Sequence, residues 1–160
     1  MKKILVIDDA SFFHTMANNA LSKEYDVTCV SNAEEAYAWL NQAIPDLILL
    51  DIFMPDEDGL TFLHHIKNTP VWSRIPVIIA TGDQNLETQD VGFYNSVADF
   101  ITKPYSSYVL KTRVANVLEL ENLRSKSGGD SVPENKPAAH IFVRGTVYAY
   151  LLENTKTDIY

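Results

Sequence analysis

The chain has 160 residues, which is enough for one well-packed domain with a short appendage and too few for two full domains. Hydrophobic residues make up 46% and charged residues 21%, an ordinary globular composition. The formal net charge of −8 argues against a surface that binds nucleic acid or anionic lipid, because such surfaces are basic. We therefore expect neither nucleic acid nor a membrane among the partners.

Two further features bear on location. The apolar segment Ile4–Ile7 ends at Asp8, which makes it too short for a secretory signal, and no other segment of the sequence could span a bilayer. The single cysteine, Cys29, cannot form an internal disulfide, and its apolar neighbours favour a buried structural thiol over a reactive one. A cytoplasmic protein is the expectation.

The predicted elements begin with a strand at Lys3–Ile7, followed by a helix that Ser11 caps and that runs to about Leu21. A second strand at Tyr25–Val30 precedes a helix capped by Asn32. The apolar residues of this helix share one face, at Ala33, Ala36, Tyr37 and Leu40.

The alternation continues with strands at Leu47–Leu50 and Val77–Ala80, separated by a helix that opens at Asp58-Gly59. A weaker helical pattern at Gln84–Tyr94 precedes the last strand, Asp99–Ile101. The final helix runs from Tyr105 to Arg124, with its apolar face at Leu110, Val114, Val117 and Leu118.

Three segments of these strands are apolar at every position, as strands covered by helices on both faces must be: Ile4–Ile7, Leu47–Leu50 and Val77–Ala80. Strands and helices alternate strictly, and right-handed crossovers then give a doubly wound α/β sheet. We expect this domain to occupy residues 1–125. Residues 126–160 have the composition of a linker followed by an apolar, aromatic segment at Ile141–Leu152, which either docks on the domain, joins a partner or begins a second domain.

Polar residues follow four of the predicted strands. Asp8 and Asp9 follow the first, Asp51 the third, Thr81 the fourth and Lys103 the fifth. A single aspartate in such a place is usually a helix cap or a turn residue. Three carboxylates at one edge of a sheet repel one another unless a hard cation or a lysine neutralises them, and ligands of this fold class bind at that edge. Oxygen ligands suit Mg²⁺, and the ion together with Lys103 would attract a phosphoryl group.

Four short motifs carry a family resemblance: Ile7-Asp8-Asp9, Leu50 to Gly59, Ala80-Thr81-Gly82 and Thr102-Lys103-Pro104. In this order and at these spacings they resemble the receiver domains of response regulators in two-component signalling, the chemotaxis regulators included. The resemblance covers Lys2 to about Leu123. It implies a flavodoxin-like sheet of strand order 2-1-3-4-5.

The resemblance also implies the roles of the acidic residues. Asp51 would be the phosphoacceptor, which takes a phosphoryl group from a histidine kinase or a phosphotransfer protein. Asp9 and Asp51 would ligate Mg²⁺ directly, Asp8 would act mainly through metal-bound water, and Phe53 would ligate through its backbone carbonyl.

The remaining motif residues would bind the phosphoryl group and transmit its presence. Lys103 would pair with the phosphoryl oxygens, and Thr81 would hydrogen-bond one of them. A cis bond to Pro104 would aim the lysine into the site; the alternative is that Pro104 is an ordinary proline at the start of the last helix. Phe100 stands where the family has a rotating aromatic residue, commonly tyrosine, and would turn inward behind Thr81. Gly82 stands where alanine is common, which would loosen the adjoining loop.

The expected output is a protein-interaction surface on the last two helices and the last strand, which binds a downstream protein. Some receivers exchange dimer salt bridges at the positions of Asp99 and Arg113, so a phosphorylation-dependent homodimer is a further expectation. The pair His64-His65 resembles a metal site, but adjacent helical residues point apart, which favours solvated histidines. Trp39 and Trp72 are interpreted as packing residues.

Two other functions would use some of the same residues. A phosphatase of the haloacid dehalogenase type also uses an aspartyl nucleophile, but it needs Asp-x-Asp after the first strand, and here Asp8 and Asp9 are adjacent. A degenerate receiver that binds partners without phosphorylation is disfavoured, because Asp9, Asp51, Thr81 and Lys103 are all present. We therefore expect a signalling switch and not an enzyme.

Overall fold

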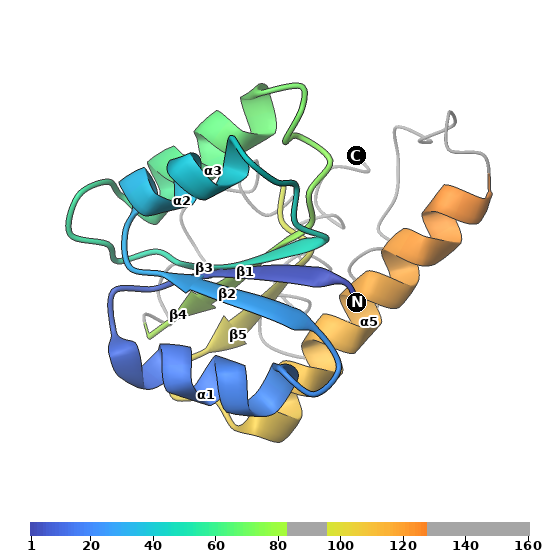
Figure 1. Cartoon of the computed structure of the whole chain (residues 1–160), viewed down its shortest axis with the longest axis horizontal. Coiled ribbons are helices and arrows are strands. Elements are labelled where there is room, and N and C mark those ends of the chain that lie inside the picture. The colour runs from blue at the N-terminus through green and yellow to red at the C-terminus, as the bar shows by residue number, and fades with distance from the viewer. Residues whose placement is uncertain (83–95, 128–160) are drawn as a thin grey trace, which may run out of the picture.

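The computed structural model describes residues 1–82 and 96–127, which form a five-stranded parallel sheet flanked by helices (Figure 1). The sheet order is β2-β1-β3-β4-β5, and each neighbouring pair is parallel. The flavodoxin-like order expected from the resemblance is confirmed. The strands are β1 (Lys3–Ile7), β2 (Asp26–Val30), β3 (Leu47–Asp51), β4 (Val77–Thr81) and β5 (Asp99–Thr102).

Helices cover both faces of the sheet (Figure 1). On one face lie α1 (Ser11–Leu21) and α5 (Ser107–Lys126), and on the other lie α2 (Ala33–Leu40) and α3 (Gly59–Asn68). The helix expected at Gln84–Tyr94 and the segment Ile141–Leu152 lie outside the described residues. Within the described part of the chain, no helix is both long enough and apolar enough to cross a membrane.

The core divides at the sheet because successive strand residues point to opposite faces. Ile4 and Val6 of β1 pack beneath α1 and α5, whereas Leu5 and Ile7 pack beneath α2 and α3. All five residues of β3 and all five of β4 are buried. The uninterrupted apolar strands of the sequence are thus the inner strands of the sheet, as predicted.

The starts of α2 and α3 agree with the sequence, whereas those of α1 and α5 do not. The side chain of Asn32 accepts a hydrogen bond from the Glu35 N–H, and that of Asp58 accepts one from the Leu60 N–H, so both are the predicted caps. The prediction for Ser11 was wrong, because the N-cap is Ala10 and no side chain caps this helix. The Asp8 carboxylate accepts from the Ala10 N–H at 2.9 Å, which closes the turn after β1 and lets the helix begin at Ser11 itself.

The last helix is shifted relative to its predicted bounds. Tyr105 lies in the core before the helix starts, only 6% exposed, and the Ser106 side chain caps the helix by accepting from the Val109 N–H. The helix then continues to Lys126, two residues past the predicted Arg124. A buried aromatic residue beside an apolar helix face cannot be told from that face by periodicity alone.

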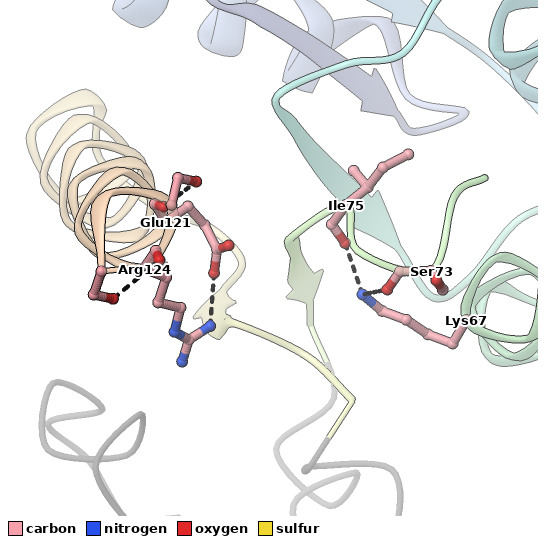
Figure 2. A network of polar contacts seen from close by, with 7 residues as sticks. Lys67, Ser73, Ile75, Glu121 and Arg124 are labelled. Atoms are coloured by element: carbon pink, nitrogen blue, oxygen red, sulfur yellow. Dashed lines mark hydrogen bonds and ion pairs between the residues drawn. The ribbon is translucent and has the colours of Figure 1, made fainter. Parts of the chain in front are cut away.

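A network of polar contacts remote from the predicted site lies at the connection from α3 to β4 and near the end of α5 (Figure 2). Lys67 at the end of α3 donates to the backbone carbonyls of Ser73 at 3.3 Å and Ile75 at 2.7 Å, and so closes the connection to β4. Burial lowers the pKa of Lys67, an effect that the charge of Glu121 on α5 opposes. Arg124 pairs with Glu121 at 2.7 Å. This network contributes structure and not chemistry.

Gly59, the first residue of α3, packs directly on the backbone after β3. A Cβ at this position would lie 2.5 Å from the Asp51 carbonyl oxygen and 2.6 Å from the Ile52 Cα. Because backbone cannot yield as a side chain can, Gly59→Ala is expected to lower the free energy of unfolding by about 3 kcal/mol. Urea unfolding in EDTA measures the change.

The control is Gly82→Ala, because a Cβ on Gly82 meets no atom of the described residues within 4 Å. Its free energy of unfolding should stay within about 0.5 kcal/mol of the wild type. Equal stabilities of the two variants would contradict the close-contact argument.

Candidate functional site

Three carboxylates meet at the carboxyl ends of the strands. Asp8 and Asp9 follow β1, and Asp51 is the last residue of β3, the strand beside β1. Pairing of Ile7 with Leu50 brings the two strand ends level. One oxygen of each carboxylate lies within 4.8 Å of the others, in a cluster in which Asp8 and Asp51 are buried and Asp9 is exposed. This is the convergence that the order of the strands predicts.

Lys103 lies against two of these carboxylates. Its Nζ is 2.5 Å from Asp8 Oδ2 and 3.2 Å from Asp51 Oδ2, and its side chain is 12% exposed. Its backbone N–H donates to the Thr81 carbonyl at 2.8 Å, and its bond to Pro104 is cis, as the resemblance implied. The ammonium partly neutralises the cluster and leaves negative charge for a further cation.

Burial raises the pKa of Asp51 above the ordinary value. The Lys103 charge and a hydrogen bond from the Phe53 N–H, 3.1 Å from Asp51 Oδ1, pull that pKa down, whereas the charge of Asp8 pushes it up. The net shift of the pKa is upward, so the ionised form of Asp51 lowers the free energy of unfolding. Such a carboxylate is expected to bind a divalent cation readily.

The raised pKa predicts how stability depends on pH. An acid whose pKa is higher in the folded state lowers stability above that pKa and has no effect below its unfolded value. In EDTA, Asp51→Asn is therefore expected to be more stable than the wild type at neutral pH, with the difference vanishing below about pH 4. Thermal melts across pH measure it. Asp26→Asn, at an exposed site on the amino end of β2, is the control, and an equal gain there would contradict the argument.

The predicted switch residues lie on the two strands beyond β3. Thr81 is the last residue of β4 and 7% exposed, and Phe100 on β5 is partly buried against the core beneath α2 and α3. The side chain of Phe53 is 58% exposed, and its backbone N–H donates to Asp51 Oδ1.

Several contacts around the site have no signature in the sequence. His14 on α1 donates from Nε2 to the Asp8 backbone carbonyl at 2.5 Å. The Asp56 carboxylate accepts from the N–H groups of Ala33 and Glu34, both at 3.2 Å, and so ties the loop after β3 to the start of α2. Asp56 lies three residues after Phe53, which the resemblance implies as a metal ligand, and this short spacing could have drawn attention to it.

The residues interpreted as structural have packing contacts of their own. His65 packs on the rings of Tyr37 and Trp72, and His64 contacts Asn68 on the exposed side of α3. Trp39 and Trp72 pack against the core, which confirms their interpretation as packing residues. Cys29 is half-buried, and burial raises the pKa of its thiol, which disfavours the reactive thiolate.

Asp99 and Arg113 are paired within one chain. Arg113 Nη1 donates to Asp99 Oδ1 at 2.9 Å and to Oδ2 at 3.1 Å. Burial raises the pKa of Asp99, and the Arg113 charge opposes that shift. A dimer that exchanged these partners would first have to break the internal pair.

The family model for the response regulator receiver domain matches residues 4–115. The chain belongs to the receiver domains of response regulators. The receiver is 36% identical over 123 residues to a probable cyclic di-GMP phosphodiesterase of Vibrio cholerae, covering 77% of this chain and 27% of that protein. It is 31% identical over 129 residues to response regulator PleD of Caulobacter vibrioides, covering 78% and 28%. The chain thus spans about a quarter of the length of these relatives.

Solved structures agree on the fold. The receiver domain of a putative LuxO repressor protein from Vibrio parahaemolyticus superimposes with a TM-score of 0.70 at 27% identity, covering 80% of this chain and 98% of that one. Chemotaxis response regulator CheY4 of Vibrio cholerae gives a TM-score of 0.68 at 24% identity, covering 73% and 98%. The receiver is a signalling domain of two-component systems. Domains of this family are activated by phosphorylation.

Proposed function

We propose that this receiver accepts a phosphoryl group on Asp51 from a phosphohistidine, in a reaction that requires Mg²⁺. The observation that carries the proposal is the position of the buried Asp51 carboxylate between Asp8, Asp9 and the Lys103 ammonium. An Asp51 oxygen attacks the phosphorus, the bond from phosphorus to the histidine nitrogen breaks, and the imidazole leaves. The donor is a sensor histidine kinase or a phosphotransfer protein, which places the receiver in the cytoplasm.

The donor set fits Mg²⁺, because oxygen ligands at a partly exposed edge let the ion keep several waters. We infer that Asp9, Asp51 and the Phe53 carbonyl hold the ion, with Asp8 acting mainly through bound water. When bound, the ion neutralises charge on the transferring group, which is most of what phosphoryl transfer requires. Asp8 is already paired with Lys103, which supports its indirect role.

The cations and donors of this chain have separate tasks. Lys103, held at the edge by two carboxylates, pairs with the phosphoryl oxygens and compensates charge that the carboxylates alone would repel. The Thr81 hydroxyl donates to one of these oxygens. Because the Thr81 carbonyl accepts from the Lys103 N–H, movement at the end of β4 is coupled to the loop that carries the lysine.

We infer that the signal leaves through β5 and α5, together with residues 84–94. When Thr81 moves toward the phosphoryl group, Phe100 rotates inward and buries apolar surface. A gain on the order of 1 kcal/mol shifts a balanced two-state equilibrium about fivefold. A downstream protein then binds this surface.

The test is to record amide NMR spectra with and without beryllofluoride and Mg²⁺. We expect shifts in the Asp8, Asp51 and Lys103 loops and also at residues 99–101 of β5 and 107–110 of α5, because the switch couples the loops to these two elements. Shifts confined to the loops would show that the site binds its ligand while Phe100 remains a static core residue.

The domain boundary is also a proposal. The family match ends at residue 115, and α5 remains packed on the core through Leu118 before continuing to Lys126. We infer that residues 1–125 form the receiver and that residues 126–160 are a linker and tail. A chain that ends in this linker should keep its melting temperature within a few degrees.

A further inference from the structure

We propose that Phe13 is a positioning residue for Lys103, whose ammonium it holds in the phosphoryl site through the face of its ring. The inference rests on the proposed function for the role of Lys103, but the contact itself can be tested without phosphorylation. Lys103 Nζ lies 4.0 Å from the centroid of the Phe13 ring. This distance is well within the range in which a cation is attracted to an aromatic face.

The ring itself is fixed from two sides. The Phe12 ring meets the Phe13 ring edge-on, with centroids 5.2 Å apart and planes at 77°. The centroid of the Tyr105 ring, in the loop between β5 and α5, lies 5.4 Å from that of Phe13. Tyr105 is 6% exposed and belongs to the core between α1 and α5. Phe13 therefore presents a defined face, anchored in the core, to the edge of the site.

Among the described residues, the ammonium contacts the carboxylates of Asp8 and Asp51 and the face of Phe13. At 12% exposure, little water competes for it, and the attraction between a cation and a ring grows as water is excluded. The two carboxylates also attract any divalent cation that enters. A hard divalent cation takes oxygen ligands in preference to an aromatic face, so the Phe13 ring stays available to the ammonium when the carboxylates acquire another partner.

The attraction between the ammonium and the ring can be separated from the packing of the ring, because the charge of the ring face can be changed while the shape of the side chain is kept. The test introduces mono-, di- and trifluorophenylalanine at position 13 in the full chain. Fluorine withdraws charge from the ring face while changing its shape little. The rate of phosphorylation by acetyl phosphate with Mg²⁺ is expected to fall stepwise, reaching roughly fivefold for the trifluoro ring. Phe62 receives the same series as a control, since it is fully buried beneath the opposite face of the sheet.

A second measurement removes phosphorylation from the test. In EDTA, the urea midpoint of the protein should fall along the fluorine series at position 13, and this trend should vanish in a Lys103→Met background. If the wild type accepts no phosphoryl group, the proposed function fails, and the urea series still decides whether the ring binds the ammonium.

Rates and midpoints that do not depend on fluorination at position 13, or that fall equally for Phe62, would overturn the proposal. Phe13 would then be only a packing residue of the core. Because the rate series uses no lysine variant, it remains decisive even if Lys103→Met does not fold.

Discussion

Replacement of Asp51 with alanine is expected to abolish phosphorylation of this receiver. Of the three clustered carboxylates, Asp51 alone ends an inner strand while also contacting Lys103, the cation assigned to the phosphoryl group. Loss of the nucleophile leaves no acceptor oxygen at that position, so the effect should be complete and not a fractional loss of rate. Intact-mass spectrometry after incubation with acetyl phosphate and Mg²⁺ measures it as the absence of a one-phosphoryl mass gain.

The matched control is Asp58→Asn in the same loop. Asp58 caps α3 through the Leu60 N–H at 2.8 Å, and asparagine is an equally good cap, so the fold should be preserved. This variant should gain one phosphoryl group as the wild type does. An equal mass gain in Asp51→Ala would show that another residue is the acceptor and would refute the assignment.

Addition of Mg²⁺ is expected to raise the stability of the receiver. A ligand that binds only the folded state adds about 2.7 kcal/mol to the free energy of unfolding at about 100 times its dissociation constant. The bound ion relieves the repulsion among the carboxylates of Asp8, Asp9 and Asp51. The Lys103 ammonium neutralises this negative charge only in part. Urea unfolding in EDTA and in millimolar Mg²⁺ measures the difference.

Asp9→Ala should lose most of this gain, because it removes a carboxylate that we propose as a direct ligand. Its stability in EDTA should rise only slightly, because Asp9 is exposed whereas the buried Asp8 and Asp51 already pair with Lys103. Asp26→Ala removes one charge at the opposite end of the sheet and should keep the full response to Mg²⁺. A wild type whose stability does not respond to Mg²⁺ would contradict the metal site.

The sequence by itself determined the order of elements and the edge of the sheet where chemistry is expected. Segments such as Leu47–Leu50 and Val77–Ala80 are apolar throughout, and only inner strands covered on both faces require this. Parallel strands have their carboxyl ends at one edge, so residues that follow the strands must approach one another there. Asp8, Asp51 and Lys103 were predictable for that reason.

The tertiary structure alone decided which groups touch. Phe13 belongs to an ordinary amphipathic helix pattern, and its place over Lys103 depends on how α1 packs beside the loop after β5. The tie of Asp56 to α2 and the start of the first helix at Ser11 depend equally on distances between elements. Periodicity reports which face of an element is buried, whereas a contact requires the position of two elements in space, and that position is set by side-chain packing across the whole core.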